Sequence, residues 1–323
     1  MLVTGGAGYV GSHCCKAFAA AGWEVVTLDN LSRGFREAVR WGPLVEADVA
    51  DQAATIAAIS KFQPDVIAHF AAYAYVAESV VQPDIYYRNN SVATLALLDA
   101  MRAVGARRLL FSSTCATYGH PISLPMDEAH PQVPINAYGW SKLIVERMLE
   151  DYARAFGLST IALRYFNAAG CDPDGDIGES HDPETHAIPL AIAAALTKTG
   201  SFEVFGTDLQ TRDGSAIRDY VHVTDLAEAH VLAAKHLMTS VGADAFNLGT
   251  GAGTTVLEIV NAVNRATGSS LEVRASPPRA GDPPVLVASA TKALKSFGWT
   301  PKYSAIDFIV ETALNWQTKR MEL

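Results

Sequence analysis

The chain has 323 residues, 49% of them hydrophobic, and a formal net charge of −9 at pH 7. This length fits one large α/β domain or two smaller ones, and the even composition indicates a folded globular protein. The acidic balance argues against a nucleic-acid binder and against a protein of anionic membranes. We find no signal peptide and no apolar run as long as a bilayer span, so we expect a cytoplasmic protein without a membrane partner.

The first 30 residues contain the clearest ligand-binding signal. A short strand, Leu2–Thr4, leads through a glycine-rich turn into a helix that ends near Ala21. Glycines at positions 5, 8 and 11 allow a tight turn and close approach to a pyrophosphate, and the helix amino terminus adds amide donors. A second strand, Glu24–Leu28, ends at Asp29, 18 residues after Gly11. A carboxylate there accepts hydrogen bonds from a ribose and repels a 2′-phosphate, so the unit predicts NAD rather than NADP.

Strands and helices then alternate up to residue 167. We expect strands at Leu44–Ala47, Asp65–Phe70, Arg107–Ser113 and Ser159–Tyr165, and helices at Gln52–Phe62, Asp84–Val104 and Ala137–Ala155. This order predicts a Rossmann-type, doubly wound parallel sheet that binds ligands at the carboxyl ends of its strands. Five residues follow such ends: Asp29, Asp48, Ala71, Thr114 and Asn167. His69, within an apolar strand, is expected to be a hydrogen-bonded core residue.

The second half of the chain is less regular. Residues Cys171–Glu184 are rich in Asp, Gly and Pro, as expected of a linker or a loop over a site. We expect residues 1–170 to form the NAD-binding domain and residues 171–323 to form a smaller α/β substrate-binding domain. The expected helices there are Ile188–Thr197, Val223–Met238, Val256–Thr267 and Ala305–Lys319, and the strands Glu203–Phe205, Ala245–Leu248 and Leu271–Arg274. The helix Val223–Met238 is a candidate to pack back on the first domain.

Tyr138 and Lys142 lie four residues apart, which puts them on one face of the expected helix. An ammonium group beside a phenol favours the phenolate and lowers its pKa from about 10. Thr114 adds a strand-end hydroxyl that can bridge Tyr138 and a substrate. Such a Tyr–Lys pair is common on helix faces, but beside a dinucleotide unit it predicts that Tyr138 is a proton acceptor supported by Lys142 and Thr114.

Two arginines of the second half stand beside aspartates. Arg218 precedes Asp219, and Arg279 lies three residues before Asp282. A guanidinium fork suits phosphate oxygens, and Asp282 can accept from a sugar hydroxyl, so the pair suggests a nucleotide-sugar substrate. Each arginine could instead form a surface ion pair. The four cysteines match neither a metal-ligand spacing nor a disulfide framework, and we expect no metal site.

Several of these segments together resemble the extended short-chain dehydrogenase/reductases, and among them the UDP-glucose 4-epimerase family. The resemblance covers nearly the whole chain and rests on Thr4-Gly5-Gly6-Ala7-Gly8-Tyr9-Val10-Gly11-Ser12-His13, Asp29-Asn30-Leu31-Ser32, His69-Phe70-Ala71-Ala72, Ser112-Ser113-Thr114-Cys115-Ala116-Thr117-Tyr118-Gly119, Tyr138 with Lys142, Arg164-Tyr165-Phe166-Asn167, Arg218-Asp219-Tyr220 and Arg279-Ala280-Gly281-Asp282.

The resemblance implies a set of site residues. Those at NAD would be Gly5, Gly8, Tyr9, Val10, Gly11, Asp29, Asn30, Ser32, Gly34, Asp48, Val49, Phe70, Ala71, Ala72, Asn90, Tyr138, Lys142 and Phe166. Those at the UDP-sugar would be Thr114, Asn167, His186, Phe205, Arg218, Arg279 and Asp282. It also implies a homodimer through a bundle of the helices Asp84–Val104 and Ala137–Ala155.

The implied reaction inverts carbon 4 of a UDP-sugar, first of all UDP-glucose and UDP-galactose, through a transient 4-keto sugar. Four positions depart from common family residues: Thr114 replaces Ser, Ala74 a Lys, His186 an Asn, and Leu286 an aromatic residue in some members. UDP-arabinose, UDP-xylose and UDP-N-acetylhexosamines stay open as substrates. A sugar-nucleotide dehydratase is disfavoured because Cys115 and Ala116 supply no acid after Thr114. An alcohol dehydrogenase and a non-catalytic NAD-binding protein are further alternatives; the latter would have no need of the Tyr138–Lys142 pair.

Overall fold

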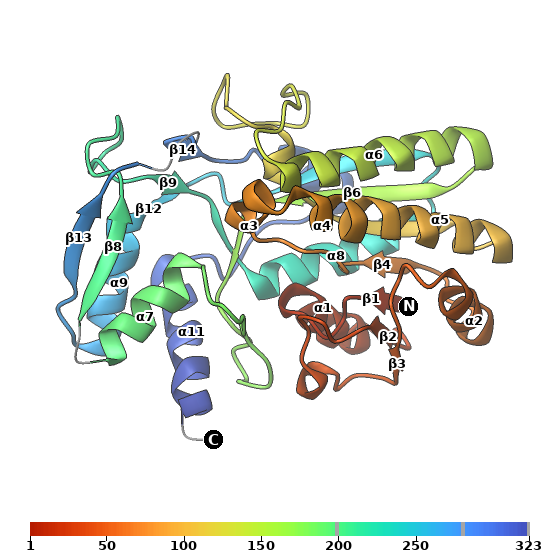
Figure 1. Ribbon diagram of the computed structural model, residues 1–323, viewed down its shortest axis with the longest axis horizontal. Coiled ribbons are helices and arrows are strands. Elements are labelled where there is room, and N and C mark those ends of the chain that lie inside the picture. The colour runs from red at the N-terminus through yellow and green to blue at the C-terminus, as the bar shows by residue number, and fades with distance from the viewer. Residues whose placement is uncertain (198–199, 279–281, 322–323) are drawn as a thin grey trace.

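The computed structural model describes residues 1–197, 200–278 and 282–321. Its main feature is a parallel seven-stranded sheet in the order β11-β6-β5-β4-β1-β2-β3. The strands are β1 Leu2–Thr4, β2 Val26–Asp29, β3 Leu44–Glu46, β4 Ile67–His69, β5 Arg108–Thr114, β6 Ser159–Tyr165 and β11 Ala243–Leu248. The central strands are apolar runs buried on both faces, as a parallel sheet covered by helices requires. The predicted Rossmann-type doubly wound fold is confirmed (Figure 1).

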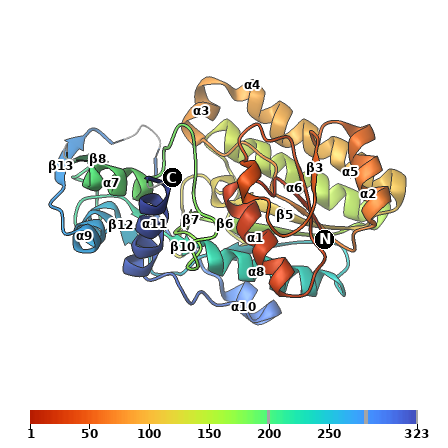
Figure 2. The same cartoon turned by 90° about the horizontal axis from the view of Figure 1, so that it is seen from below.

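Helices cover both faces of this sheet (Figure 2). On one face α1 (Tyr9–Ala20) packs against α8 (Val223–Leu237), and their apolar side chains share a core with β1 and β6. On the other face lie α2 (Gln52–Phe62), α5 (Ala93–Val104) and α6 (Ala137–Phe156). Both ring nitrogens of His69 are hydrogen-bonded: Nδ1 to Thr4 Oγ1 at 2.6 Å and Nε2 to Thr94 Oγ1 at 2.8 Å. It is the core histidine that the sequence predicted.

The segment 223–248 belongs with the large sheet, although it follows residues of the smaller unit. Helix α8 lies on α1, and β11 pairs in parallel with β6, from Ala243 opposite Thr160 to Leu248 opposite Tyr165. We placed Ala245–Leu248 with the second half of the chain; its buried Phe246 and Leu248 instead complete the core at this edge of the sheet. The division of the chain at residue 170 into two domains stays a prediction.

The region expected as one helix, Asp84–Val104, is divided in three. Helix α4 (Pro83–Tyr86) continues into a π-helical turn, Tyr87–Val92, and then into α5, which ends at Gly105 in the left-handed conformation. A short α3 (Val76–Val81) precedes it. A sequence pattern of period 3.6 does not reveal the extra residue of a π turn, and such turns recur at functional sites. This one contains Asn90, which the resemblance places at the cofactor.

The smaller unit combines three helices with short strands around its own apolar core. The helices are α7 (Ala187–Leu196), α9 (Val256–Thr267) and α11 (Ile306–Met321), with α10 (Thr291–Phe297) near β11; the strands are β7 Asn167–Ala169, β8 Ser201–Phe205, β9 Ile217–Arg218, β10 Tyr220–His222, β12 Thr254–Thr255, β13 Glu272–Ser276 and β14 Val285–Leu286. Helix α9 begins with a capping box between Thr255 and Glu258. Within the described residues no helix is both long enough and apolar enough to span a membrane.

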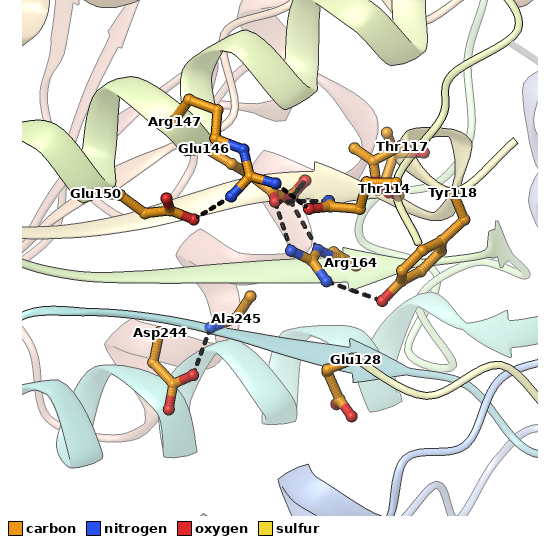
Figure 3. Close-up of polar contacts among 12 residues, drawn as sticks. Thr114, Thr117, Tyr118, Glu128, Glu146, Arg147, Glu150, Arg164, Asp244 and Ala245 are labelled. Carbon is orange, nitrogen blue, oxygen red and sulfur yellow. Dashed lines mark hydrogen bonds and ion pairs between the residues drawn. The ribbon is translucent and has the colours of Figure 1, made fainter. Parts of the chain in front are cut away.

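A buried ion pair joins α6 to the sheet (Figure 3). Arg164 of β6 donates from Nε and Nη2 to Glu146 of α6 at 2.9 and 2.6 Å. Ser113 of β5 donates to the same carboxylate at 2.5 Å, and Arg164 Nη1 donates to the Tyr118 hydroxyl at 2.9 Å. Because both charges are buried and fully hydrogen-bonded, neither can lose its partner without a large desolvation cost.

We predict that Arg164→Met destabilises the protein by about 3–5 kcal/mol, because it leaves the Glu146 carboxylate buried without its counter-charge. The double variant Glu146→Leu, Arg164→Met should recover much of that loss. Arg154→Met is the matched control, since Arg154 pairs with Asp151 on the exposed side of α6 and should change stability by less than about 1 kcal/mol. Urea unfolding of the four proteins measures this; equal losses for Arg164→Met and Arg154→Met would contradict the role of the buried pair.

Candidate active site

The glycine-rich turn between β1 and α1 has no space for a side chain at Gly5 or Gly11. Gly5 has φ +73°, and a Cβ there would lie 2.4 Å from the Ala71 amide nitrogen. A Cβ on Gly11 would lie 2.1 Å from the Gly5 carbonyl oxygen. Gly8 is the N-cap of α1 and offers no side-chain cap, so the first amides of the helix are available to an anion. The turn therefore fits the pyrophosphate of a dinucleotide.

The residues expected at the adenosine end gather around Asp29. Its Oδ2 accepts from the Ala7 amide at 3.0 Å and its Oδ1 from the Leu31 amide at 2.8 Å, which leaves a lone pair on each oxygen for a ribose hydroxyl. Burial raises the pKa of Asp29, and these two amides counteract the shift. Asn30 donates to Asp48 at 2.8 Å. Of the other residues predicted at the adenosine end, Ser32 is exposed beside Asn30 and Val49 is buried. Gly34 lies close to Ala7, since a Cβ on Gly34 would be 2.8 Å from Ala7 Cβ.

Asn90 fixes the chain that follows β4. Its amide oxygen accepts from the Tyr73 amide at 2.8 Å, and its nitrogen donates to Tyr73 O and to Ser141 Oγ, both at 3.0 Å. The π turn thus ties the segment after β4 to the first turns of α6. Phe70, Ala71 and Ala72 in that segment are partly buried, and Tyr9 and Val10 lie opposite on α1, where the Tyr9 hydroxyl donates to Gly170 O at 2.5 Å. Phe166 is buried past the end of β6.

The Thr114 hydroxyl lies beside the Tyr138 phenol at the carboxyl end of β5, where it favours the phenolate. Thr114 also caps the 3₁₀ turn Cys115–Thr117 by accepting from the Ala116 amide at 3.1 Å. Gly139 permits this meeting, because any Cβ there would lie 2.4 Å from the Ala116 carbonyl oxygen. We gave Gly139 no role in the sequence analysis; its position directly after Tyr138, at the start of a helix, was the available signal.

The Lys142 side chain reaches from α6 to β5. Its ammonium group donates to Ser112 O at 2.9 Å and lies 4.9 Å from the centroid of the Phe111 ring. Burial raises the pKa of Tyr138 to about 12, and the neighbouring Thr114 hydroxyl counteracts only part of this rise. The expectation that Lys142 lowers the pKa of Tyr138 is thus wrong: desolvation of the phenol dominates, and Thr114 rather than Lys142 is the group that opposes it. Burial likewise lowers the pKa of Lys142 to about 7, against the pull of Glu146.

Arg218 and Asp282 lie near the residue that follows Thr114 at the end of β5. Arg218 Nη2 donates to Asp282 Oδ1 at 2.7 Å, so the ion pair that the sequence left open is present. The charge of Arg218 also opposes the burial that raises the pKa of Cys115, the residue after Thr114. Asn167 opens β7 beside β10, and Phe205 ends β8. Arg279 lies outside the described residues.

His186 stands at the N-cap of α7, away from Arg218 in a group of ionisable residues. Its Nδ1 lies 2.9 Å from Glu184 Oε1 and 3.0 Å from Glu179 Oε1. These carboxylates outweigh burial and raise the pKa of His186 to about 10. The role of His186 as a uridine contact stays a prediction, as do the individual roles of the other site residues.

Comparison with known proteins assigns the family. The NAD dependent epimerase/dehydratase family model matches residues 1–249. The UDP-glucose 4-epimerase of Rhizobium leguminosarum bv. trifolii is 50% identical over 319 residues, which cover 99% of this chain and 97% of that protein. The chain therefore belongs to the NAD dependent epimerase/dehydratase family.

Two solved structures narrow the similarity to the UDP-glucose 4-epimerases. The enzyme of that name from Brucella ovis, in complex with NAD, has a TM-score of 0.94 at 52% identity over 97% of both chains. The enzyme from Bifidobacterium longum, in complex with NAD⁺ and UDP, has a TM-score of 0.93 at 34% identity over 99% of this chain and 98% of that one. The predicted resemblance, the enzyme class and the cofactor, NAD, are thereby confirmed.

We predict that Lys142 makes stability depend on pH. Its pKa falls from 10.5 in the unfolded chain to about 7 in the fold, so between these values the unfolded state binds more protons. The free energy of unfolding should rise with pH across this window, by up to about 5 kcal/mol, and Lys142→Met should lack that rise. Urea unfolding from pH 7 to 10, with the exposed Lys235→Met as control, measures the difference. Parallel pH profiles for Lys142→Met and the wild type would contradict the shift.

Proposed function

We propose that this protein is a UDP-glucose 4-epimerase, which interconverts UDP-glucose and UDP-galactose with bound NAD. The main support is the Thr114–Tyr138 pair of hydroxyls, because it lies at the same edge of the sheet as the glycine-rich turn and Asp29. Similarity to enzymes of this name over nearly the whole chain supports the substrate class. When bound, NAD⁺ accepts a hydride at its nicotinamide ring and brings a positive charge to the site.

Tyr138 would act as the base. It takes the proton of the sugar's 4-hydroxyl, directly or through Thr114, while the hydrogen on carbon 4 leaves as hydride. The 4-keto sugar then rotates to present its other face. The hydride and the proton return to that face, which inverts carbon 4. With a pKa of about 12, Tyr138 is a phenol at neutral pH in the ligand-free protein. The phenolate therefore depends on positive charge that arrives with the cofactor, and Lys142 adds to it when its ammonium group is protonated.

The substrate must be held firmly at UDP and loosely at the sugar. We assign the diphosphate to Arg218, together with Arg279, and hydroxyl contacts to Asp282; Asn167, Phe205 and His186 complete the expected set. The Arg218–Asp282 ion pair at 2.7 Å supports this assignment, because it holds an oriented guanidinium near the end of β5.

The purified protein should convert UDP-galactose to UDP-glucose without added NAD, because the cofactor must stay bound between the two half-reactions. Tyr138→Phe should lower kcat by about 10²–10⁴-fold and retain NAD, whereas the exposed Tyr87→Phe should keep both. Chromatography of the sugar nucleotides and release of NAD on denaturation are the measurements. Full turnover by Tyr138→Phe would rule out the proposed base, and release of NADH during turnover would favour an alcohol dehydrogenase.

A panel of UDP-glucose, UDP-galactose, their N-acetyl forms and UDP-arabinose then ranks the sugars. The highest kcat/KM should belong to the two hexoses. A higher value for UDP-arabinose would indicate a pentose epimerase instead.

The four cysteines are free thiols, which supports the expected cytoplasmic location.

We also propose a homodimer through α5 and α6. Large apolar side chains are exposed along this face: Val92 at the end of the π turn, Leu95 on α5, and Trp140 and Ile144 on α6. The two helices lie side by side on the outer face of the large sheet (Figure 1), so these side chains support a continuous dimer face.

Leu95→Glu should therefore shift the protein toward monomer, because it buries a charge at the centre of this face. Leu294→Glu is the matched control, since Leu294 is as exposed on α10, far from α5. Light scattering of both variants and the wild type gives the mass. A monomeric wild type would remove the proposal.

A further inference from the structure

Four potential metal ligands lie within eight residues of the loop between β7 and α7. They are Glu179, His181, Glu184 and His186. Each contributes one ligand atom, and the four atoms lie within 4.8 Å of one another. We expected no metal from the spacing of the cysteines; this group contains imidazoles and carboxylates instead.

The separations between these atoms lie at or just below the spacing of a filled tetrahedral shell, so the two His186 contacts, one of them a hydrogen bond to Glu184, must lengthen by a few tenths of an ångström around an ion. His186 Nδ1 lies 2.9 Å from Glu184 Oε1 and 3.0 Å from Glu179 Oε1. His181 Nδ1 lies 3.3 Å from Glu179 Oε1 and 3.5 Å from Glu184 Oε2. Tetrahedral zinc with bonds of about 2.0–2.2 Å places neighbouring ligand atoms roughly 3.3–3.6 Å apart.

Two of the atoms are buried and lack hydrogen bonds. The Glu179 side chain is only 4% exposed, yet its Oε1 has no hydrogen-bond partner, and neither has His181 Nδ1. Glu179 Oε1 has ion-pair contacts with His181 Nδ1 at 3.3 Å and His186 Nδ1 at 3.0 Å, but neither contact has hydrogen-bond geometry. An unsatisfied buried polar atom costs about 1–3 kcal/mol, and more for a charged group, so both atoms call for a partner between them.

Neighbouring residues hold the ligands in place. Glu179 O accepts from Trp316 Nε1 at 3.0 Å, and the Glu179 amide donates to Cys171 Sγ at 3.3 Å. The ring of His181 lies edge-on to Tyr9 and Tyr75, with centroids 6.0 and 5.9 Å away. The cluster is thus built into the junction of α1, α11 and the start of α7.

A second acidic group in the same loop shows the contrast. Asp172, Asp174 and Asp176 also lie close together, but the ammonium group of Lys16 contacts them at 2.7, 2.8 and 3.1 Å. A protein cation already neutralises that group, and no buried oxygen of it lacks a partner among the described residues. It gives no reason to infer a metal.

We propose that Glu179, His181, Glu184 and His186 bind one divalent transition-metal ion, with Zn²⁺ as the best match. Imidazole nitrogens favour zinc over magnesium and calcium, and two carboxylates balance its charge. Four protein ligands form a closed, structural site, so the ion fastens the loop that leaves β7 to the first residue of α7. The ion takes no part in the proposed hydride transfer, so metal uptake and turnover of UDP-galactose are tested separately. The two proposals share only His186, whose Nδ1 would bind the ion and whose Nε2 would be left for the expected substrate contact.

Metal analysis of the untagged wild-type protein tests the site. After chelation and dialysis, titration with ZnCl₂ should saturate at about one equivalent, and Co²⁺ should give the intense visible absorption of a tetrahedral complex. Bound Zn²⁺ should also raise the unfolding temperature of the chelated protein. Wild-type protein that takes up no saturable Zn²⁺ or Co²⁺ would overturn the proposal.

The double variant His181→Ala, His186→Ala should bind Zn²⁺ at least about tenfold more weakly, and the exposed His120→Ala should bind like the wild type. Circular dichroism establishes that each variant is folded. Unchanged affinity in a folded double variant would overturn the assignment. If the double variant does not fold, the Co²⁺ spectrum and stoichiometry of the wild type decide the question by themselves.

Discussion

The buried ion pair between Glu146 and Arg164 sets the position of the proposed chemistry. Its two parallel hydrogen bonds, at 2.9 and 2.6 Å, fasten α6 to β6 in a region where water cannot replace either partner. Lys142 lies one helical turn before Glu146, and Tyr138 lies one turn before Lys142. A shift of α6 along the sheet would therefore move the phenol, the amine and the carboxylate together, away from Thr114.

Close backbone contacts achieve the rest of the positioning. Gly11 lies so near Gly5 that neither can carry a side chain, and a Cβ on Gly139 would lie 2.4 Å from the carbonyl oxygen of Ala116. The first contact leaves the amides of α1 open to a phosphate, and the second brings the start of α6, with Tyr138, against the turn that follows Thr114. Both depend on the missing Cβ, since an alanine at either place would overlap main-chain atoms.

The charged groups expected at the ligands are hydrogen-bonded to protein partners. Arg218 is held by Asp282, and the lone pairs of Asp29 are half used by backbone amides. Tyr138 and Lys142 are both shifted toward their neutral forms by burial, so the site is less charged than its composition suggests. A cationic cofactor and an anionic substrate would thus meet polar side chains that are already held in position, beside a phenol and an amine that are largely uncharged.

The sequence alone determined the alternation of strands and helices, the glycine-rich turn before α1 and the acidic residue at the end of β2. These are local features, because periodicity, turn residues and spacing act within a few residues of one another. Only the tertiary structure decided that β11 completes the large sheet, that Asn90 sits in a π turn, and that Lys142 donates to a carbonyl of β5. Pairing partners and burial come from segments far apart in the chain, and burial is what reversed the expected pKa of Tyr138.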